Sequence, residues 1–483
     1  MSGKVILVGA GPHDPKLLTI AAIEELAKAE VVVYDRLVSD DIMNLIPDEV
    51  ERIYVGKNAG RHPVKQEEIN QILLEQAQAG KRVVRLKGGD SFLFGRGGEE
   101  LELIKEQGIA YKVVPGISSS LSVPTYAGIP VTHRDYCSSV HIITGHKKED
   151  QTLDLDYDAL VRLKGTLIFM MSVKSSPMIM EGLITAGMSE DMPVAIIENG
   201  TSPMQRKVVT TTGGLKEDIV KHAVKSPAIV MVGKVCALEF DWFMNGPLFG
   251  KKILVTRPKK HADKMADALR EAGAMVTIAS TIETKAIKVM VPDLQQYSTM
   301  IFTSGNGVRA FFEALYQTGQ DVRAIAHMKF ATVGTQTRKE LLSFGIASDF
   351  LPSVFEGDVL AKEMLEEGFL SLDDKTLIIR GSLSAELMQE RLKAAEILFD
   401  ELICYETNYV KHDAIELSEY EVVTFTSASA VTSFVESYDY YQHLTAYCIG
   451  EMTATEARKY GFEVRVSKEA TINSMVECMI ETM

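Results

Sequence analysis

The stretch VVRLKGGDSFLFGRGGEELELI, from Val83 to Ile104, decides how the first half of the chain is organised. It opens as a short apolar run typical of a buried strand, and it ends as a helical pattern with acid in its first turn, where the helix dipole favours negative charge. Between the two, five glycines in eleven positions surround Asp90. Glycines at the end of a strand let the backbone come close to a ligand. We therefore predict a strand, a ligand-binding loop and a helix rather than a plain turn.

Composition restricts the class of protein and its partners. The chain has 483 residues, 46% of them hydrophobic and 24% charged, and a net charge of −15. At roughly 150 residues per domain the length suggests about three folding units. The acidic balance argues against nucleic-acid or anionic-membrane partners, and no run approaches the ~18 apolar residues of a membrane span. The N-terminus has no signal-peptide pattern, and the five cysteines are scattered without a CxxC pair, so we expect a reduced, cytoplasmic protein.

The N-terminus combines a glycine turn with an acid at the end of the next strand. A strand over Lys4 to Val8 precedes the turn GAGPHDP, a helix over Leu17 to Ala29 and a strand over Val31 to Asp35. This order resembles a dinucleotide-binding fingerprint, but Asp14 stands where the third glycine belongs. Asp35 is therefore open to three interpretations: a ribose ligand, a general base or a solvated strand end.

The remaining pattern of the first half alternates strands with helices, which predicts an α/β fold with a mostly parallel or mixed sheet. A helix is expected over Gln66 to Gln78, and the proline-rich segment Val113 to Asp135 looks like a boundary between lobes at about 1–116 and 117–245. The break Asn245-Gly246-Pro247 marks the main boundary, after which a second domain covers 250–483. Further strands are predicted in HIITGHKK, GTLIFMM, PVAIIENGT and PAIVMVGKV.

The second half contains an internal repeat. IFTSGNGVRAFF at Ile301 matches TFTSASAVTSFV at Thr424, and ATVGTQTRKELL at Ala331 matches AYCIGEMTATEA at Ala446. Two similar α/β lobes with parallel sheets follow from this repeat. Each FTS serine is expected at the end of a strand and the start of a helix, where it caps the helix or helps to bind an anion.

No metal or nucleotide-phosphate motif stands out. His133, His141 and His146 are irregularly spaced and lack acidic partners, so we assign no metal site. GxxxxGK[ST] and GxSxG motifs are absent from the sequence, which argues against ATP-driven phosphoryl transfer and against a serine-hydrolase elbow.

The first half resembles the uroporphyrinogen-III C-methyltransferases, which are S-adenosylmethionine enzymes of the tetrapyrrole methylase fold. The resemblance rests on an ordered set of motifs over residues 1–245: GAGPHDPKLLT, VVVYDRLVS, VGKNAG, RLKGGDSFLFGRGGEE, VVPGISS, YAGIPVTHRDY, ITGH and PVAIIENGT. It implies a dimeric enzyme that methylates uroporphyrinogen III twice to precorrin-2. The cofactor contacts that it implies are Pro12, Gly88, Gly89, Asp90, Leu93, Ser118, Ser119, Met171 and Gly200.

The same resemblance implies catalytic roles for Asp35 as proton acceptor and Lys57 as proton donor. These residue types suit the chemistry, because a pyrrole carbon that accepts a methyl group becomes positively charged and must lose a proton. Candidates for the substrate's carboxylates are arginines, whose fork geometry matches a carboxylate: Arg61, Arg85, Arg96 and Arg134. His13 and Ser91 stand where this family usually has glycine and proline, and either change could alter loop closure.

The second half resembles uroporphyrinogen-III synthase, through ILVTRP, the paired FTS motifs, CYET and IGEMTATEARKYG. The resemblance implies that hydroxymethylbilane is cyclised without a metal or cofactor. Tyr405 is our candidate catalytic residue, assisting departure of the leaving group, although a packed tyrosine at a strand end is an equal alternative. The candidate substrate-binding residues are Ser304, Thr337, Ser427 and Thr453.

Together these patterns predict a methyltransferase–synthase fusion acting in consecutive steps of tetrapyrrole biosynthesis. Two alternatives stay open at this point. In the first, the C-terminal half binds a tetrapyrrole without turning it over. In the second, the glycine turn and Asp35 belong to a nicotinamide oxidoreductase. The sequence does not separate the cobalamin from the sirohaem pathway.

Overall fold

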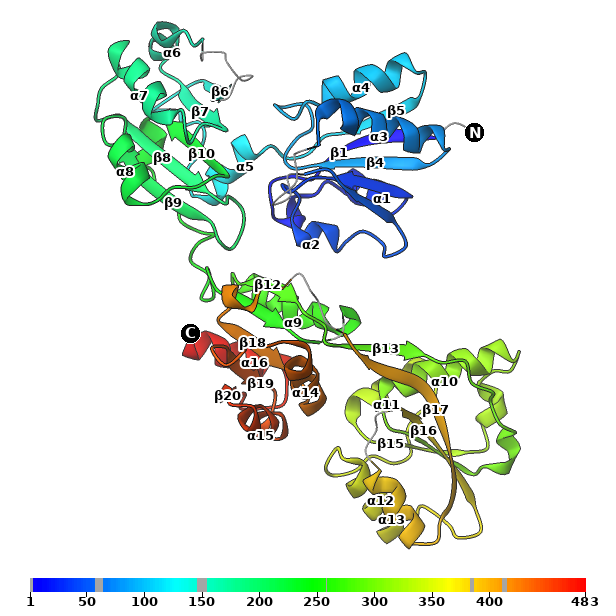
Figure 1. Ribbon diagram of the computed structural model, residues 1–483. Coiled ribbons are helices and arrows are strands. Elements are labelled where there is room, and N and C mark those ends of the chain that lie inside the picture. Colours follow the sequence, from blue (N-terminus) through cyan, green and yellow to red (C-terminus); the bar gives the residue numbers. More distant parts are fainter. Residues whose placement is uncertain (1–2, 57–63, 146–153, 258, 383–385, 411–414) are drawn as a thin grey trace. The chain divides into compact units, whose positions relative to one another are not determined.

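The structure is a computed structural model that describes residues 3–56, 64–145, 154–257, 259–382, 386–410 and 415–483. Contacts between residues divide it into two compact units (Figure 1). Unit 1 comprises 1–251 with 269–275 and 483, and unit 2 comprises 252–268 with 276–482. Within the described ranges, no helix is both long and apolar enough to cross a membrane.

The first lobe of unit 1 is a five-stranded sheet in the order β3-β2-β4-β1-β5, with every pair of neighbouring strands parallel. The chain leaves β1 towards β2 and leaves β4 towards β5, so these two neighbouring strands form a topological switch point, the place where α/β sheets bind ligands. The elements are β1 (Lys4–Gly9), η1 (Pro15–Leu17), α1 (Ile20–Leu26), β2 (Val31–Tyr34), α2 (Asp40–Met43), β3 (Glu51–Tyr54), α3 (Gln66–Gln78), β4 (Arg82–Lys87), α4 (Gly97–Glu106) and β5 (Ala110–Val114).

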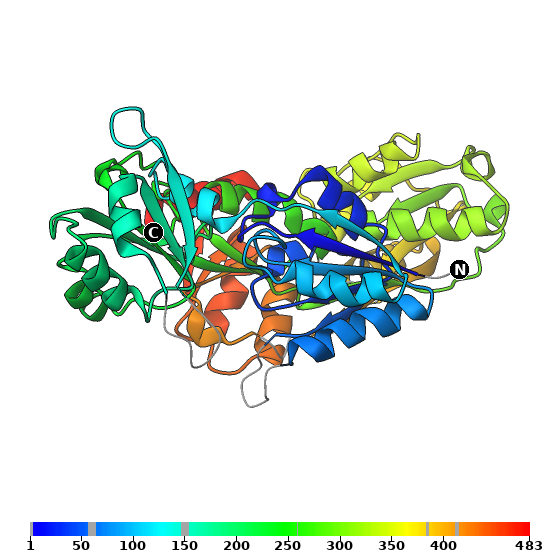
Figure 2. The ribbon, with the colours of Figure 1, turned by 90° about the horizontal axis from the view of Figure 1, so that it is seen from above.

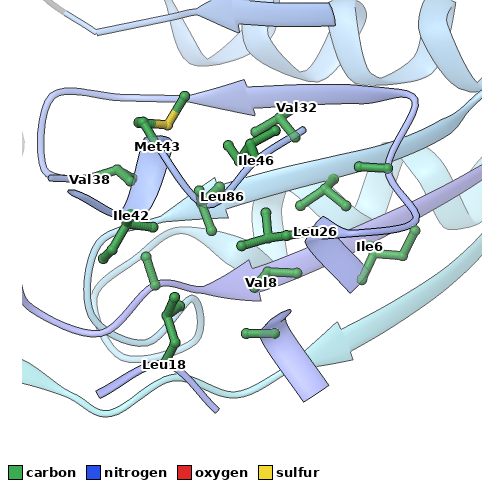
Figure 3. Close-up of a cluster of buried hydrophobic side chains, with 14 of the residues drawn as sticks. Ile6, Val8, Leu18, Leu26, Val32, Val38, Ile42, Met43, Ile46 and Leu86 are labelled. Atoms are coloured by element: carbon green, nitrogen blue, oxygen red, sulfur yellow. The ribbon is translucent and has the colours of Figure 1, made fainter. Parts of the chain in front are cut away.

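Both faces of this sheet are covered, because successive side chains of a strand point to opposite faces. On β1, Ile6 and Val8 join a core with residues of α1 and α2, whereas Val5 and Leu7 join a second core with residues of α3 and α4. Figure 3 shows the first of these cores. Helices α3 and α4 lie side by side (Figures 1 and 2). The buried strands explain the near-continuous apolar runs in the sequence.

The second lobe of unit 1 has a mixed sheet in the order β6-β7-β10-β8-β9, in which only the β6–β7 pair is parallel. Helix α5 packs on one face, and α6, α7 and α8 pack on the other. The elements are α5 (Ser119–Tyr126), β6 (Val140–Thr144), α6 (Tyr157–Leu163), β7 (Thr166–Met170), α7 (Ser176–Thr185), β8 (Pro193–Glu198), β9 (Arg206–Thr211), α8 (Leu215–Lys221), β10 (Ala228–Val232) and η2 (Lys234–Ala237).

The first sheet of unit 2 has the order β12-β11-β18-β19-β20, and its β11–β18, β18–β19 and β19–β20 pairs are parallel. Its elements are β11 (Lys252–Val255), α9 (Lys259–Glu271), β12 (Met275–Ile278), η5 (Leu417–Glu419), β18 (Val422–Phe425), α14 (Ala428–Ser437), β19 (Thr445–Cys448), α15 (Glu451–Lys459), β20 (Glu463–Val466) and α16 (Ile472–Thr482).

The second sheet of unit 2 is formed by the middle of this half, in the order β13-β17-β16-β14-β15. It is parallel except for the edge strand β13, which runs antiparallel to β17 (Figure 1). Its elements are β13 (Ile282–Ala286), η3 (Leu294–Gln296), β14 (Thr299–Phe302), α10 (Gly305–Gln317), η4 (Val322–Ile325), β15 (Lys329–Thr332), α11 (Thr335–Ser343), α12 (Gly357–Glu366), β16 (Lys375–Gly381), α13 (Leu387–Ala394) and β17 (Leu398–Tyr409).

The α/β class and the internal repeat are confirmed. Each FTS motif ends a strand and starts a helix, with the serine as N-cap of α10 in one lobe and of α14 in the other. Each VG or IG pair likewise separates a strand from a helix, with the glycine at the N-cap position of α11 and α15. The two lobes of unit 2 therefore repeat the same strand–turn–helix units.

One local prediction was wrong, and one strand was missed. The helix expected over Leu17 to Ala29 is shorter, because Thr19 caps α1 and the preceding residues form a 3-10 turn. Strand β9 was not predicted, since only Val208 of its six residues is buried and the segment has no apolar run. The parallel sheets expected for unit 2 are confirmed, with the edge strand β13 as an antiparallel addition to the second sheet.

Candidate functional site

Glycines hold the loops at the switch point of the first sheet together. Gly11 and Gly89 bond each other through both backbone groups, with N···O distances of 3.1 and 2.6 Å. A Cβ on Gly116, after β5, would lie 2.2 Å from the carbonyl oxygen of Gly89 and 2.7 Å from the Cα of Gly9. Real Cβ atoms do not approach so closely, and Gly89 also has a left-handed φ of 71°. The loops after β1, β4 and β5 therefore meet only because these positions lack side chains.

Asp90 ties two of these loops with a single carboxylate. Its Oδ1 accepts the backbone N–H groups of Phe92 and Leu93 at 2.8 and 3.2 Å, and its Oδ2 accepts that of Gly116 at 3.0 Å. Beyond Gly116, Ser118 caps α5, accepting the N–H of Ser120 at 3.2 Å. The predicted contacts thus lie on neighbouring, mutually bonded loops: Gly88, Gly89, Asp90 and Leu93 on one, and Ser118 and Ser119 on the other. Whether they bind a cofactor stays a prediction.

Asp35 lies at the carboxyl end of β2, on the same edge of the sheet. Its Oδ1 accepts the N–H of Leu37 at 3.0 Å, and its Oδ2 accepts an N–H of Arg85 at 3.1 Å. Its side chain is 25% exposed, whereas that of Arg85 is 3% exposed. A Cβ on Gly88 would lie 2.7 Å from the Cβ of Leu37, so the loop of Asp35 packs directly on the glycine loop. The buried guanidinium of Arg85 therefore holds the carboxylate of Asp35 in place, while the side chain stays partly exposed to solvent.

A buried cluster of charges lies behind Asp35. Arg85 and Lys87, both on β4, donate to the same oxygen of Glu100 of α4. Its Oε1 lies 3.2 Å from Arg85 Nε and 2.7 Å from Lys87 Nζ. Burial lowers the pKa of Lys87, and the charge of Arg85 adds to this, while Glu100 opposes it. Arg85 had been a candidate for binding a substrate carboxylate, but its guanidinium is occupied inside the protein.

The first turn also contacts the second lobe of unit 1. The N–H of His13 donates to Thr201 Oγ1 at 3.1 Å, and Tyr126 of α5 donates to Asp14 at 2.8 Å. Burial and the hydrogen bond to Asp14 raise the pKa of Tyr126. A Cβ on Gly200 would lie 2.3 Å from a methyl carbon of Val123, so this glycine lets its loop pack on α5. The predicted residues Pro12 and Gly200 are therefore on loops that touch each other.

Five other predicted site residues have different surroundings or lie outside the described residues. Met171 follows β7, is 53% exposed and has a left-handed φ of 54°. Arg96, at the N-cap of α4, pairs with Glu99 at 2.6 Å, and Arg134 is exposed. Lys57 and Arg61 lie outside the described residues, as does His146.

The two departures from the family pattern are both buried or half-buried. His13 accepts a hydrogen bond from Ser39 through its carbonyl at 2.8 Å, and burial lowers the pKa of its imidazole, opposed by Asp41, Asp14 and Asp40. Ser91 is 1% exposed, and its hydroxyl makes no hydrogen bond to any described residue. Its carbonyl accepts the N–H of Gly97 at 3.0 Å, which closes the loop before α4.

In unit 2 the structure brings together two predicted residues that are far apart in sequence. Tyr405 of β17 and the N-cap residue Ser304 of α10 are hydrogen-bonded through their hydroxyl groups at 2.9 Å. A Cβ on Gly381 would lie 2.4 Å from the Tyr405 ring, so this glycine makes room for the tyrosine. Burial raises the pKa of Tyr405, and the bond to Ser304 opposes that rise. The pair can donate a hydrogen bond to a leaving oxygen.

The other candidate residues of unit 2 occupy equivalent places in the repeat. Ser427 caps α14 and bonds Ser429 at 3.0 Å, as Ser304 caps α10. Thr337 and Thr453 are buried, each in the first turn of its helix. Helix starts of this kind present free backbone N–H groups to an anion. Their role in binding substrate stays a prediction.

Metal ligation and surface hollows were also surveyed over the described part of the chain. There, no group of three or more His, Cys, Asp or Glu side chains is arranged to hold a metal ion. One surface hollow, of about 590 Å³, is lined by residues 415–418, 438–440 and 443. Another, of about 670 Å³, is lined by residues 155–158, 178, 181, 182, 185 and 186. Neither contains a predicted site residue, so the candidate sites rest on the loops described above.

Comparisons with known proteins match the two halves of the chain, each with its own candidate site, to two different families. A family model for tetrapyrrole (corrin/porphyrin) methylases matches residues 4–216, and one for uroporphyrinogen-III synthase HemD matches residues 263–477. A "porphyrin biosynthesis protein HemD" of Ruminiclostridium josui is 45% identical over 495 residues, covering 99% of this chain and 98% of that protein.

Two further similarities cover the first half. "Siroheme synthase 2" of Klebsiella pneumoniae is 53% identical over 245 residues, which make up 50% of this chain and 53% of that protein, so the match spans about half of that relative. The crystal structure of a uroporphyrin-III C-methyl transferase from Thermus thermophilus complexed with S-adenyl homocysteine is 38% identical, covering 48% of this chain and 98% of that chain, with a TM-score of 0.42.

Proposed function

We propose that the two halves of the chain catalyse consecutive reactions. The chain belongs to the tetrapyrrole methylase family through its first half and to the uroporphyrinogen-III synthase family through its second. It is therefore a bifunctional enzyme of tetrapyrrole biosynthesis. The second half cyclises hydroxymethylbilane to uroporphyrinogen III. The first half methylates that product twice, with S-adenosylmethionine as methyl donor, to precorrin-2. The observation that carries the proposal is that one relative, 45% identical, spans both halves in the same order.

We propose residues 1–245, in two lobes, as the methyltransferase and 250–483 as the synthase. The residues of the first half fit the cofactor, because the loops of Gly88 to Asp90 and of Ser118 and Ser119 are bonded to each other at the carboxyl ends of β4 and β5, the switch point at which α/β sheets bind ligands. Pro12, Gly88 to Asp90, Leu93, Ser118, Ser119, Met171 and Gly200 would hold it. When bound, S-adenosylmethionine supplies a methyl group on a sulfonium centre. The five cysteines are free thiols, which supports a cytoplasmic location, and we further propose that the methyltransferase half dimerises.

Asp35 is the proposed proton acceptor of the methylation. Its carboxylate is held at the strand end and partly exposed, so it can stabilise the positive charge that the pyrrole ring gains and then accept the ring proton. Lys57 is the proposed proton donor.

In the synthase, the hydroxyl pair of Tyr405 and Ser304 is proposed to assist loss of the leaving oxygen. The linear substrate must be folded before its last ring inverts, and excluding water from the electron-deficient intermediate does much of the work. Ser304, Thr337, Ser427 and Thr453 would bind the substrate's carboxylates through the helix starts of both lobes.

One feeding experiment tests both reactions. The intact chain is given hydroxymethylbilane and methyl-labelled S-adenosylmethionine, and the products are separated and identified by mass. We expect uroporphyrinogen III to appear first and doubly labelled precorrin-2 to follow. Accumulation of unlabelled uroporphyrinogen III would contradict the methyltransferase assignment, and a spontaneous isomer would contradict the synthase assignment. An equilibrium binding measurement with NAD, in which we expect no binding, separates the oxidoreductase alternative.

A further inference from the structure

Glu100 is a fully buried acid in the first turn of α4, on the side that faces the sheet. Its Oε1 accepts three hydrogen bonds, from Lys87 Nζ at 2.7 Å and from Arg85 Nε and Gln66 Nε2 at 3.2 Å each. Its side chain is 0% exposed. An acid is rarely buried so completely unless cations pair with it, because desolvating the carboxylate is costly. Helix formation alone therefore does not explain why an acid is buried at position 100.

Arg85 connects Glu100 to the proposed catalytic acid. It lies opposite Val33 in the parallel register of β2 and β4, two residues before Asp35. All three of its guanidinium nitrogens donate: Nε to Glu100, one terminal nitrogen to the carbonyls of Val33 and Leu86, and the other to Asp35. A planar guanidinium whose nitrogens are all engaged has one orientation, so moving its Nε partner would move the group that holds Asp35.

We propose that Glu100 is a positioning residue for the methyltransferase reaction, which holds Arg85 so that its guanidinium fixes the carboxylate of Asp35 at the end of β2. This inference rests on the proposed function, because it assumes that Asp35 accepts the ring proton. Glu100 itself does not touch the substrate, since it is shielded from solvent.

The negative charge of Glu100 matters as well as its shape. Asp35, Arg85, Lys87 and Glu100 form a cluster of two carboxylates and two cations, in which one oxygen of Glu100 pairs with both cations. A glutamine at position 100 could still accept a hydrogen bond, but it would leave two buried cations sharing Asp35. We expect Arg85 and Lys87 then to repel each other and Arg85 to turn away from its present orientation.

The test is a double-mutant cycle on the intact chain, with uroporphyrinogen III and labelled S-adenosylmethionine as substrates. Glu100→Gln should lower kcat on the order of 10- to 100-fold, the loss typical of a misplaced reacting group, with KM for S-adenosylmethionine nearly unchanged. In an Asp35→Asn background the same substitution should have almost no further effect, because its route to the reaction is already gone. A merely structural role would lower the rate equally in both backgrounds.

Two controls accompany the cycle. Glu102→Gln makes the same change on the same helix at an exposed position, and it should leave methylation unchanged. If Glu100→Gln does not fold, Lys87→Met/Glu100→Gln replaces it, because this pair of changes leaves Asp35 and Arg85 as one balanced ion pair. The synthase activity of each variant reports whether the rest of the chain is intact.

The outcomes separate the positioning role from the proposed function. A wild-type chain that transfers no methyl group overturns the proposed function and this inference with it. An active wild type in which Glu100→Gln is as fast as wild type, or in which its effect adds fully to that of Asp35→Asn, overturns the positioning role alone.

Discussion

The two candidate sites differ in the side chains that hold the central residue in place. In unit 1, Asp35 is backed by a cluster of buried charges on β4 and α4, with Arg85 3% and Glu100 0% exposed. In unit 2, Tyr405 is backed by a neutral hydroxyl at the start of α10, and glycine makes room for its ring. The first arrangement holds a carboxylate through a buried cation, and the second holds two neutral hydroxyl groups against each other.

This difference determines what each site should tolerate. Buried charges depend on one another, so removing one member of the cluster leaves another unpaired in a medium of low polarity. A pair of hydroxyls loses only one hydrogen bond when one partner is replaced, and the helix start next to it remains. Unit 1 should therefore respond sharply to charge removal, and unit 2 should respond weakly to any single polar change.

The largest expected effect is that of Asp35→Asn on methylation. Replacing the carboxylate by an amide removes the proposed proton acceptor while keeping its size, and we expect kcat to fall by ~10²–10⁴-fold. Affinity for S-adenosylmethionine, measured by calorimetric titration, should stay nearly the same, and synthase activity should be unaffected. Asp48→Asn, at a site with 82% side-chain exposure in the same lobe, is the matched control. A large loss of cofactor affinity would instead support the ribose-ligand interpretation.

A second, smaller effect tests the packing of the loops in unit 1. Gly116→Ala should destabilise the chain by about 1–3 kcal/mol, because the added methyl overlaps the backbones of Gly89 and Gly9. Gly98→Ala is the control, since a Cβ there meets nothing within 4 Å and Gly98 lies in the first turn of α4. Scanning calorimetry of both variants measures the difference. Equal unfolding temperatures would show that the loops rearrange without cost.

A weaker effect is expected from Tyr405→Phe in unit 2. Synthase activity should fall by roughly tenfold or less, the equivalent of one hydrogen bond, and no other polar substitution among our candidates should cost more. Tyr409→Phe, an exposed tyrosine on the same strand, should be neutral. Because burial raises the pKa of Tyr405 above its usual 10.0, the hydroxyl stays protonated at neutral pH. The stability that this protonated hydroxyl contributes is fully present below pH 10 and is lost only as the pH rises through the raised pKa. Abolished activity would show that unit 2 depends on this one hydroxyl and does not tolerate its loss.

What the sequence predicted well was local. The glycine clusters and the capping serines depend on a few adjacent residues, and strand ends, turns and helix starts appeared where Gly88, Ser304 and Ser427 indicated them. The contact between Ser304 and Tyr405 could not be predicted in this way, because 101 residues separate them and only the sheet order brings them together.

The buried role of Glu100 was missed, although a signal for it existed. In the sequence, the acids at the start of α4 look alike, because each is a favourable charge near a helix N-terminus. The buried residues of this helix are Gly97, Glu100, Leu101 and Ile104, which repeat at the helical period. An acid on the apolar face of a helix indicates a buried partner, and the two basic residues within the strand RLK were the available partners.

The smallest predicted effect concerns His13, a titrating group on the first turn of unit 1. Burial lowers the pKa of its imidazole below 6.5, opposed by Asp41, Asp14 and Asp40, so the folded chain favours neutral His13. The unfolded chain then binds this proton first as pH falls, and the stability that His13 contributes is present above about pH 6.5 and is lost as pH drops through the folded pKa.

His13→Gln removes this titration but keeps the backbone bonds to Thr201 and Ser39. We therefore expect the unfolding temperature of the variant to fall less than that of the wild type between pH 7.5 and 5.5, as measured by calorimetry. His222→Gln, which removes a more exposed imidazole from the C-cap of α8, should follow the wild type. A steeper fall in His13→Gln would mean that the three nearby acids outweigh burial and that His13 is charged in the folded protein.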